Sequence, residues 1–92
     1  MSNTKIQTTK KVTIYTTPSC HFCHMVKELL KKHYVRYEEI DVKEDLGQRQ
    51  AMILISGQMG VPVIVIEDED EMEPKIMVGF DKEKLLNLLD IK

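Results

Sequence analysis

The only two cysteines of this 92-residue chain stand three positions apart, at Cys20 and Cys23. They follow a short apolar run that ends at Tyr15, and a run of helix-forming residues begins directly after them. A CxxC pair at the start of a helix places its first sulfur beside unpaired backbone N–H groups, whose partial positive charge favours a thiolate. The second sulfur lies one helical turn further on. The pattern therefore predicts a redox pair in which Cys20 attacks and Cys23 closes an intramolecular disulfide.

Other uses of the same cysteines stay open at this point. A zinc site needs four ligands, and the chain offers only three imidazoles, at His21, His24 and His33. A closed tetrahedral site within the motif would be strained, so the sequence predicts no metal site. A metal or iron–sulfur carrier remains one rival function, and a redox-sensing interaction module is another. His21, between the two cysteines, is either an exposed bystander or a residue whose cationic form tunes the Cys20 thiolate.

Composition predicts one globular domain over residues 1–92, with 42% hydrophobic and 30% charged residues. Thirteen basic and fifteen acidic side chains give a net charge of −2, so no basic field indicates nucleic-acid binding. No apolar run approaches the roughly 20 residues needed to span a bilayer, and the polar N-terminus does not resemble a signal peptide. We expect a monomeric cytoplasmic protein, in which a lone CxxC is catalytic or metal-binding.

The first half of the chain predicts a strand, a helix and a second strand. A β-branched run covers Val12–Tyr15, and a helix extends from about Cys20 to His33. The apolar positions predicted to face the core from this helix are Phe22, Met25, Val26, Leu29 and Leu30. Pro18 and Ser19 supply the turn and a cap-like residue before it. Val35–Val42 predicts a half-exposed strand whose charges suit a sheet edge.

A second helix is predicted to begin at Asp45 and continue through Ile55, with Gly57 as its left-handed stop. The unbroken apolar run Ala51–Ile55 also suits a strand. The flanking cap and stop favour the helix.

The second half ends with a hairpin and a last helix. Val63–Ile66 predicts a central strand buried on both faces, and the acidic stretch Glu67–Pro74 leads to a short strand, Lys75–Val78. Asp81 is a cap for the final helix, and Phe80 suits a hydrophobic staple to Leu85. The predicted order is β-α-β-α-β-β-α, in which the crossover rule gives a mixed sheet with helices on both faces.

The CxxC motif in this order, with Val61 and Pro62 before the third strand, resembles the thioredoxin fold and, more closely, the glutaredoxin family. The resemblance covers nearly the whole chain and implies an α/β fold with a four-stranded mixed sheet flanked by three helices. It also implies that Pro62 is cis and faces the cysteines, and that the Val61 backbone pairs with an extended substrate, with Gly60 in the same segment. The implied activity is reduction of protein disulfides by a dithiol that needs no bound cofactor.

The same resemblance bears on the electron donor. In the family the last loop usually carries two glycines and an aspartate that bind glutathione, and here that stretch is Gly79, Phe80 and Asp81. Family members commonly have a basic residue at the position of Thr17 and a threonine at that of Gly60. A Gly-Phe pair looks more like the glutaredoxin-like redoxins that take electrons from NADPH-dependent thioredoxin reductase and pass them to targets such as ribonucleotide reductase. The resemblance therefore favours thioredoxin reductase over glutathione.

Overall fold

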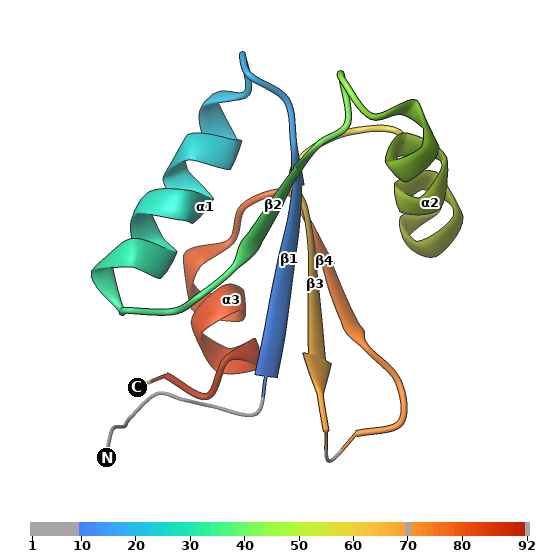
Figure 1. Cartoon of the computed structure of the whole chain (residues 1–92). Coiled ribbons are helices and arrows are strands. Elements are labelled where there is room, and N and C mark those ends of the chain that lie inside the picture. The colour runs from blue at the N-terminus through green and yellow to red at the C-terminus, as the bar shows by residue number, and fades with distance from the viewer. Residues whose placement is uncertain (1–9, 70, 92) are drawn as a thin grey trace.

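The computed structural model describes residues 10–69 and 71–91, which form an α/β sandwich (Figure 1). Its elements are β1 (Lys10–Thr16), α1 (His21–Lys32), β2 (Glu38–Asp41), α2 (Leu46–Ser56), β3 (Val63–Asp68), β4 (Lys75–Val78) and α3 (Lys82–Leu88). The predicted order of strands and helices is confirmed. The polar segment before Lys10 lies outside the described residues. None of the described helices is long and apolar enough to cross a bilayer.

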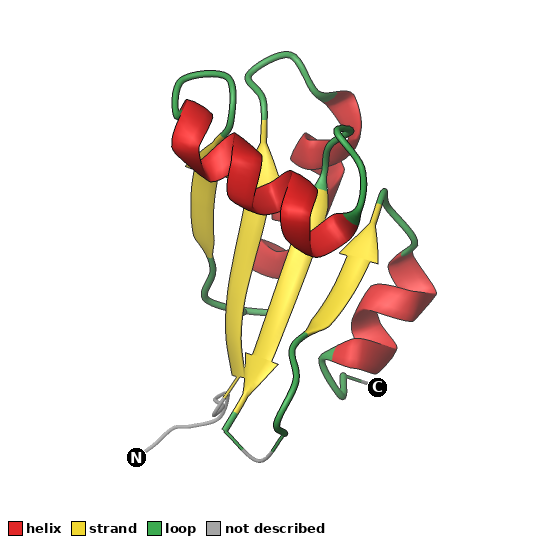
Figure 2. Cartoon of the chain, turned by 90° about the vertical axis from the view of Figure 1, so that its right-hand side faces the viewer, coloured by secondary structure: helices red, strands yellow, loops and turns green. Residues whose placement is uncertain are grey.

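The four strands form one mixed sheet in the order β2-β1-β3-β4. β1 runs parallel to β2 and antiparallel to β3, and β3 runs antiparallel to β4. The parallel pair is joined through α1, because parallel neighbours need a crossover connection. α1 and α3 lie on one face of the sheet and α2 on the other (Figure 1), and Figure 2 shows the sheet from the side that α2 covers. Both faces are therefore covered, as predicted.

Each face of the sheet has its own apolar core. The core beneath α1 and α3 contains Val12, Ile14, Val26, Leu29, Leu30, Ile64, Ile66, Met77, Leu85 and Leu89. The core beneath α2 contains Tyr15, Val42, Met52, Val63 and Val65. Because β3 is covered on both faces, its run from Val63 to Ile66 needs no polar alternation. The prediction of a buried central strand is confirmed.

β1 and β3 are longer than their sequence patterns indicate. Lys10 and Lys11 extend β1 and pair with Asp68 and Glu67 in the antiparallel register. Opposite charges across neighbouring strands stabilise the pairing, and the Lys10 ammonium lies 3.2 Å from the Asp68 carboxylate. The acidic run after Ile66 therefore begins inside the sheet.

β2 is shorter than the predicted strand Val35–Val42. The Val35 N–H donates to the Leu30 carbonyl at 2.9 Å and the Tyr34 N–H donates to the Lys31 carbonyl at 3.1 Å. Tyr34 adopts the left-handed conformation with φ 59° that helix ends often use. The N–H at the start of the predicted strand therefore bonds to the last turn of α1 instead of to β1. Among the described strands the remaining one pairs only with β1, so its predicted place at the sheet edge is confirmed.

The caps of α2 and α3 are those that the sequence predicts. Asp45 accepts a hydrogen bond from the Gln48 N–H at 3.0 Å, and Gly57 ends α2 with φ 76°. Asp81 accepts from the Lys84 N–H at 3.1 Å. The helical interpretation of the apolar run before Gly57 is confirmed over the strand alternative.

Candidate active site

Three segments that are distant in the sequence meet at one end of the sheet. Tyr15 pairs with Val63, and Val63 also pairs with Val78, so the end of β1 lies beside the start of β3 and the end of β4. The Gly79 N–H donates to the Pro62 carbonyl at 2.9 Å and joins two of the connecting loops. The CxxC loop follows β1 at this same end (Figure 1). The fold therefore gathers the predicted cysteine and substrate segments.

Cys20 is the N-cap residue of α1. Its backbone is extended (φ −85°, ψ 112°), and its sulfur accepts a hydrogen bond from the Cys23 N–H at 3.1 Å. The prediction that Ser19 is the cap-like residue is therefore wrong by one position. The physical reason is that the Cys20 sulfur satisfies one of the unpaired N–H groups of the first turn, which is what a cap does.

The two cysteines differ in how far they are buried. Cys20 and Cys23 are joined as a disulfide, with their Cα atoms 5.2 Å apart. Cys23 is 1% exposed, whereas Cys20 is only partly buried. Cys20 is therefore the more accessible residue of the pair.

The buried face of α1 is turned away from the predicted one in its first turns. Phe22 is 53% exposed and Met25 is 37% exposed, although both were predicted to face the core. Cys23 instead begins the buried stripe and is followed by Val26 and Leu30. Because successive helical residues are about 100° apart, burying Cys23 turns the preceding Phe22 toward solvent. The later part of the predicted stripe is confirmed.

The segment before β3 contains the cis proline that the resemblance implies. The peptide bond between Val61 and Pro62 is cis, as the resemblance implies. Pro62 is buried, Val61 is half-buried and Gly60 is exposed. The segment therefore runs from solvent into the core at the same end of the sheet as Cys20.

The remaining predicted site residues have structural contacts of their own. Phe80 is half-buried and packs against the core cluster that contains Leu85, in agreement with a staple. Asp81 caps α3 with one carboxylate oxygen, Oδ1. His21 is exposed, and its ring meets the edge of Phe22 with the centroids 5.6 Å apart.

The glutaredoxin family model matches residues 12–70. This chain belongs to the glutaredoxin family. As a glutaredoxin-family protein whose two CxxC cysteines form a disulfide, it is a dithiol–disulfide oxidoreductase that acts on protein disulfides. The match ends before the loop that carries Gly79, Phe80 and Asp81.

This chain is similar to known proteins in both sequence and structure. A glutaredoxin-like 8.6 kDa protein of a rubredoxin operon in Clostridium pasteurianum is 35% identical over 79 residues, which are 86% of this chain and 97% of that protein. The crystal structure of the thioredoxin-like protein BC3987 has a TM-score of 0.72 and 38% identity, over 84% of this chain and 97% of that one. A glutaredoxin from Archaeoglobus fulgidus has a TM-score of 0.68 and 29% identity, over 85% and 84% of the two chains.

One polar cluster near the cysteines is missed by sequence reasoning. The Glu39 carboxylate accepts hydrogen bonds from the Thr16 hydroxyl at 2.8 Å and from the Lys27 ammonium at 2.9 Å. The Lys27 hydrogen bond, with a smaller effect from Thr16, holds the pKa of Glu39 below its ordinary value. Burial raises the pKa of the nearby Tyr15. Thr16, Lys27 and Glu39 lie on three different elements, β1, α1 and β2. The pattern of residues along any one of these elements therefore does not predict that the three side chains meet.

We expect the contacts of Glu39 to stabilise the fold at neutral pH and to be lost in acid. The folded-state pKa lies below the unfolded value of about 4.3, so the stabilisation is present above that value and disappears as the pH falls through the lowered pKa. The Glu39 side chain is 36% exposed, so the contribution is about 1 kcal/mol or less. Urea unfolding of wild type and Glu39→Gln between about pH 7 and about pH 3 measures it. A difference that stays constant over this range would contradict the prediction.

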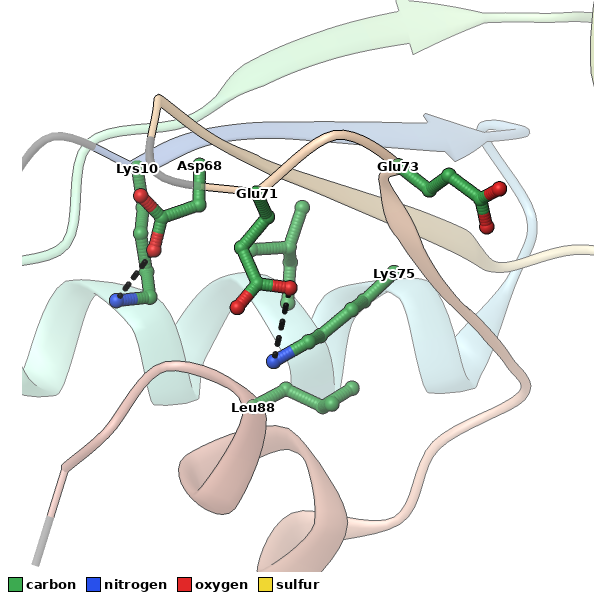
Figure 3. A pocket seen from close by; sticks show the side chains of 7 residues that line it. Lys10, Asp68, Glu71, Glu73, Lys75 and Leu88 are labelled. Atoms are coloured by element: carbon green, nitrogen blue, oxygen red, sulfur yellow. Dashed lines mark ion pairs between the residues drawn. The ribbon is translucent and has the colours of Figure 1, made fainter.

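A small pocket (Figure 3) lies at the end of the sheet where β1 begins, whereas the CxxC loop follows the other end of β1 (Figure 1). It is lined by Lys10, Ile66, Asp68, Glu71, Glu73, Lys75 and Leu88. Lys10 pairs there with Asp68, and Lys75 lies 3.9 Å from Glu71. Within residues 10–69 and 71–91, no three His, Cys, Asp or Glu side chains are grouped so that they could hold a metal ion. The acidic side chains of the β3–β4 hairpin form ion pairs at this end of the fold.

Proposed function

We propose that Cys20 is the attacking thiol and Cys23 the resolving thiol of this oxidoreductase. The Cys20 thiolate attacks one sulfur of a substrate disulfide, forms a mixed disulfide and releases the other substrate sulfur as a thiolate. Cys23 then loses its proton and attacks the Cys20 sulfur. The bond from Cys20 to the substrate breaks, and the Cys20–Cys23 disulfide forms. Two electrons pass from the protein to the substrate.

The observation that carries this proposal is the unequal exposure of two cysteines at one helix N-terminus. Cys20 is partly exposed and receives an N–H at 3.1 Å, whereas Cys23 is 1% exposed. A thiolate is stabilised by such a donor and by the positive end of the helix dipole. We also propose that the exposed His21, next to Cys20 in the sequence, tunes the Cys20 thiolate. The accessible and activated sulfur therefore starts the reaction.

The proposed substrate contact is the backbone of Gly60–Pro62. Val61 offers its N–H and C=O to an extended segment of the substrate, in the manner of an added strand. Pro62 has no N–H and keeps an unpaired donor out of the contact. These residues lie at the end of the sheet where the CxxC loop begins, which supports their assignment.

For the electron donor we propose an NADPH-dependent thioredoxin reductase in preference to glutathione. Thr17 supplies no cation for a glutathione carboxylate, and Phe80 packs against the core where the family usually has a second glycine. Asp81 already uses one oxygen to cap α3. A reductase of this kind acts in the reducing cytoplasm, which is where we propose that the protein works.

The test compares NADPH consumption during reduction of a protein disulfide with two donor systems. One contains thioredoxin reductase, and the other contains glutathione with its reductase. A missing charge-assisted contact costs about 1.5–3 kcal/mol, so the glutathione system is expected to be roughly ten- to more than a hundredfold slower. Cys20→Ser gives the background in both systems. Equal or faster turnover with glutathione would overturn the donor assignment.

A further inference from the structure

Glu39 joins the two segments that flank the CxxC motif. Its Oε2 atom accepts from the Thr16 hydroxyl at 2.8 Å and from the Lys27 ammonium at 2.9 Å. Thr16 is the last residue of β1, four positions before Cys20, and Lys27 is four positions after Cys23. One carboxylate oxygen therefore connects the base of the active-site loop to the second turn of the helix that follows it.

The partners of Glu39 are held in place. Thr16 is 2% exposed, and its carbonyl accepts from the Val42 N–H at 2.9 Å. The Lys27 side chain is only 19% exposed. Among residues 10–69 and 71–91, the ion pair of Lys27 with Glu39 is the one that joins α1 to the sheet. Its geometry is therefore more constrained than that of a freely exposed surface pair.

The contact with Glu39 lies on the turn of α1 that follows the CxxC motif. The residues that pack α1 into the core beyond the motif are Val26, Leu29 and Leu30, whereas Phe22 and Met25 are exposed. Lys27 and Cys23 are four residues apart and so are neighbours along one side of the helix. The bond to Glu39 therefore ties the helix turn next to Cys23 to the edge strand of the sheet, in addition to the apolar packing of Cys23 and Val26.

We propose that Glu39 is a positioning residue for the resolving step, in which Cys23 attacks the mixed disulfide on Cys20. The inference rests on the proposed roles of the two cysteines. Ring closure is intramolecular, and a misplacement of about 1 Å can cost roughly a hundredfold in such a step. The first attack by Cys20 on a free substrate does not use Cys23. Loss of the Glu39 contacts therefore slows the second step selectively.

The experiment follows the reaction of the reduced protein with dithiobis(nitrobenzoate), an aromatic disulfide that gives a coloured thiolate. Attack by Cys20 releases one thiolate, and closure by Cys23 releases the second together with the thiol proton. In Glu39→Ala we expect the first release at the wild-type rate and the second slowed about tenfold, within the loss that misplacement causes. Lys27→Met, which keeps Glu39 but removes one donor, should slow the second release in the same direction.

Two further variants separate positioning from charge and from general stability. Glu39→Gln keeps an oxygen acceptor for both donors without the charge, so the position of α1 is kept, and both releases are expected to stay within about twofold of wild type. Glu71→Ala breaks a more exposed ion pair at the far end of the fold, and is expected to leave both releases unchanged. If Glu39→Ala leaves the second release unchanged, slows both releases equally, or is matched by Glu39→Gln, the positioning role is overturned.

The same reaction distinguishes an error in the proposed role of Glu39 from an error in the proposed roles of the two cysteines. With the proposed roles, Cys23→Ser still gives the first release and never the second. If Cys23→Ser instead abolishes the first release, the roles of the cysteines are wrong, whatever Glu39→Ala does. If Cys23→Ser behaves as expected and Glu39→Ala has no effect, only the positioning role is overturned.

Discussion

Replacing Cys20 with serine is expected to reduce disulfide-reducing activity to background, whereas Cys23→Ser is expected to accumulate mixed disulfides with substrate proteins. A serine hydroxyl stays protonated near neutral pH and does not replace a thiolate as the nucleophile. In Cys23→Ser the attacking thiolate remains at the helix N-terminus, so the first step proceeds. The adduct persists because the buried partner that would release it is absent.

Mass spectrometry of the trapped protein measures this result directly. The adduct on Cys23→Ser should map to Cys20, and the reciprocal Cys20→Ser protein should carry none. The free energies of unfolding of both variants are compared with that of the reduced wild type, so that loss of the disulfide itself is not counted against a variant. An adduct on Cys23 in the Cys20→Ser protein would reverse the assignment.

Introducing a cation at Thr17 is expected to raise turnover with glutathione. Thr17 lies between β1 and the cysteines, in a half-buried position at the site. A lysine there supplies a charge-assisted contact to a glutathione carboxylate that the uncharged Thr17 side chain cannot make. Such a contact is worth about 1.5–3 kcal/mol, or roughly ten- to more than a hundredfold in the rate at low glutathione. Turnover with thioredoxin reductase, which needs no such contact, is expected to change little.

Controls separate a specific contact from a general change in the loop. Thr17→Gln extends the side chain without charge and is expected to leave the glutathione rate unchanged. The gain in Thr17→Lys should also decrease as salt is added, because salt screens exposed charge pairs. If wild type already uses glutathione efficiently and loses that activity in Lys82→Ala, a cation from the last loop supplies the contact. That outcome would contradict the donor assignment while leaving the dithiol mechanism intact.

Local chemistry in the sequence determined most of the fold. Asp45, Gly57 and Asp81 cap or stop their helices through contacts within a few residues, so their roles can be predicted without knowing the tertiary structure. The β-branched run of β3 and the cysteines at the start of α1 are local signals of the same kind. The order of elements and the redox pair follow from such signals.

Tertiary contacts decided the strand lengths and the surroundings of the cysteines. The lengths of β1 and β3 depend on Lys10 meeting Asp68, and the start of β2 depends on Val35 bonding back to α1. The burial of Cys23 in place of Phe22 depends on how α1 is turned over the sheet.

Glu39 is the clearest example of a side chain whose contacts only the tertiary structure decides. A carboxylate on an edge strand is typical of a solvated side chain, and nothing in the local sequence distinguishes this one from its neighbour Glu38. It meets Thr16 and Lys27 only because the parallel register of β1 and β2 places it opposite Ile14, on the face that α1 covers. The sequence by itself determined that the cysteines stand at the start of a helix, because the signals for that helix lie within one or two turns of them. Only packing between elements decided which side chains hold them in place, because those contacts join residues that are 12 and 23 positions apart.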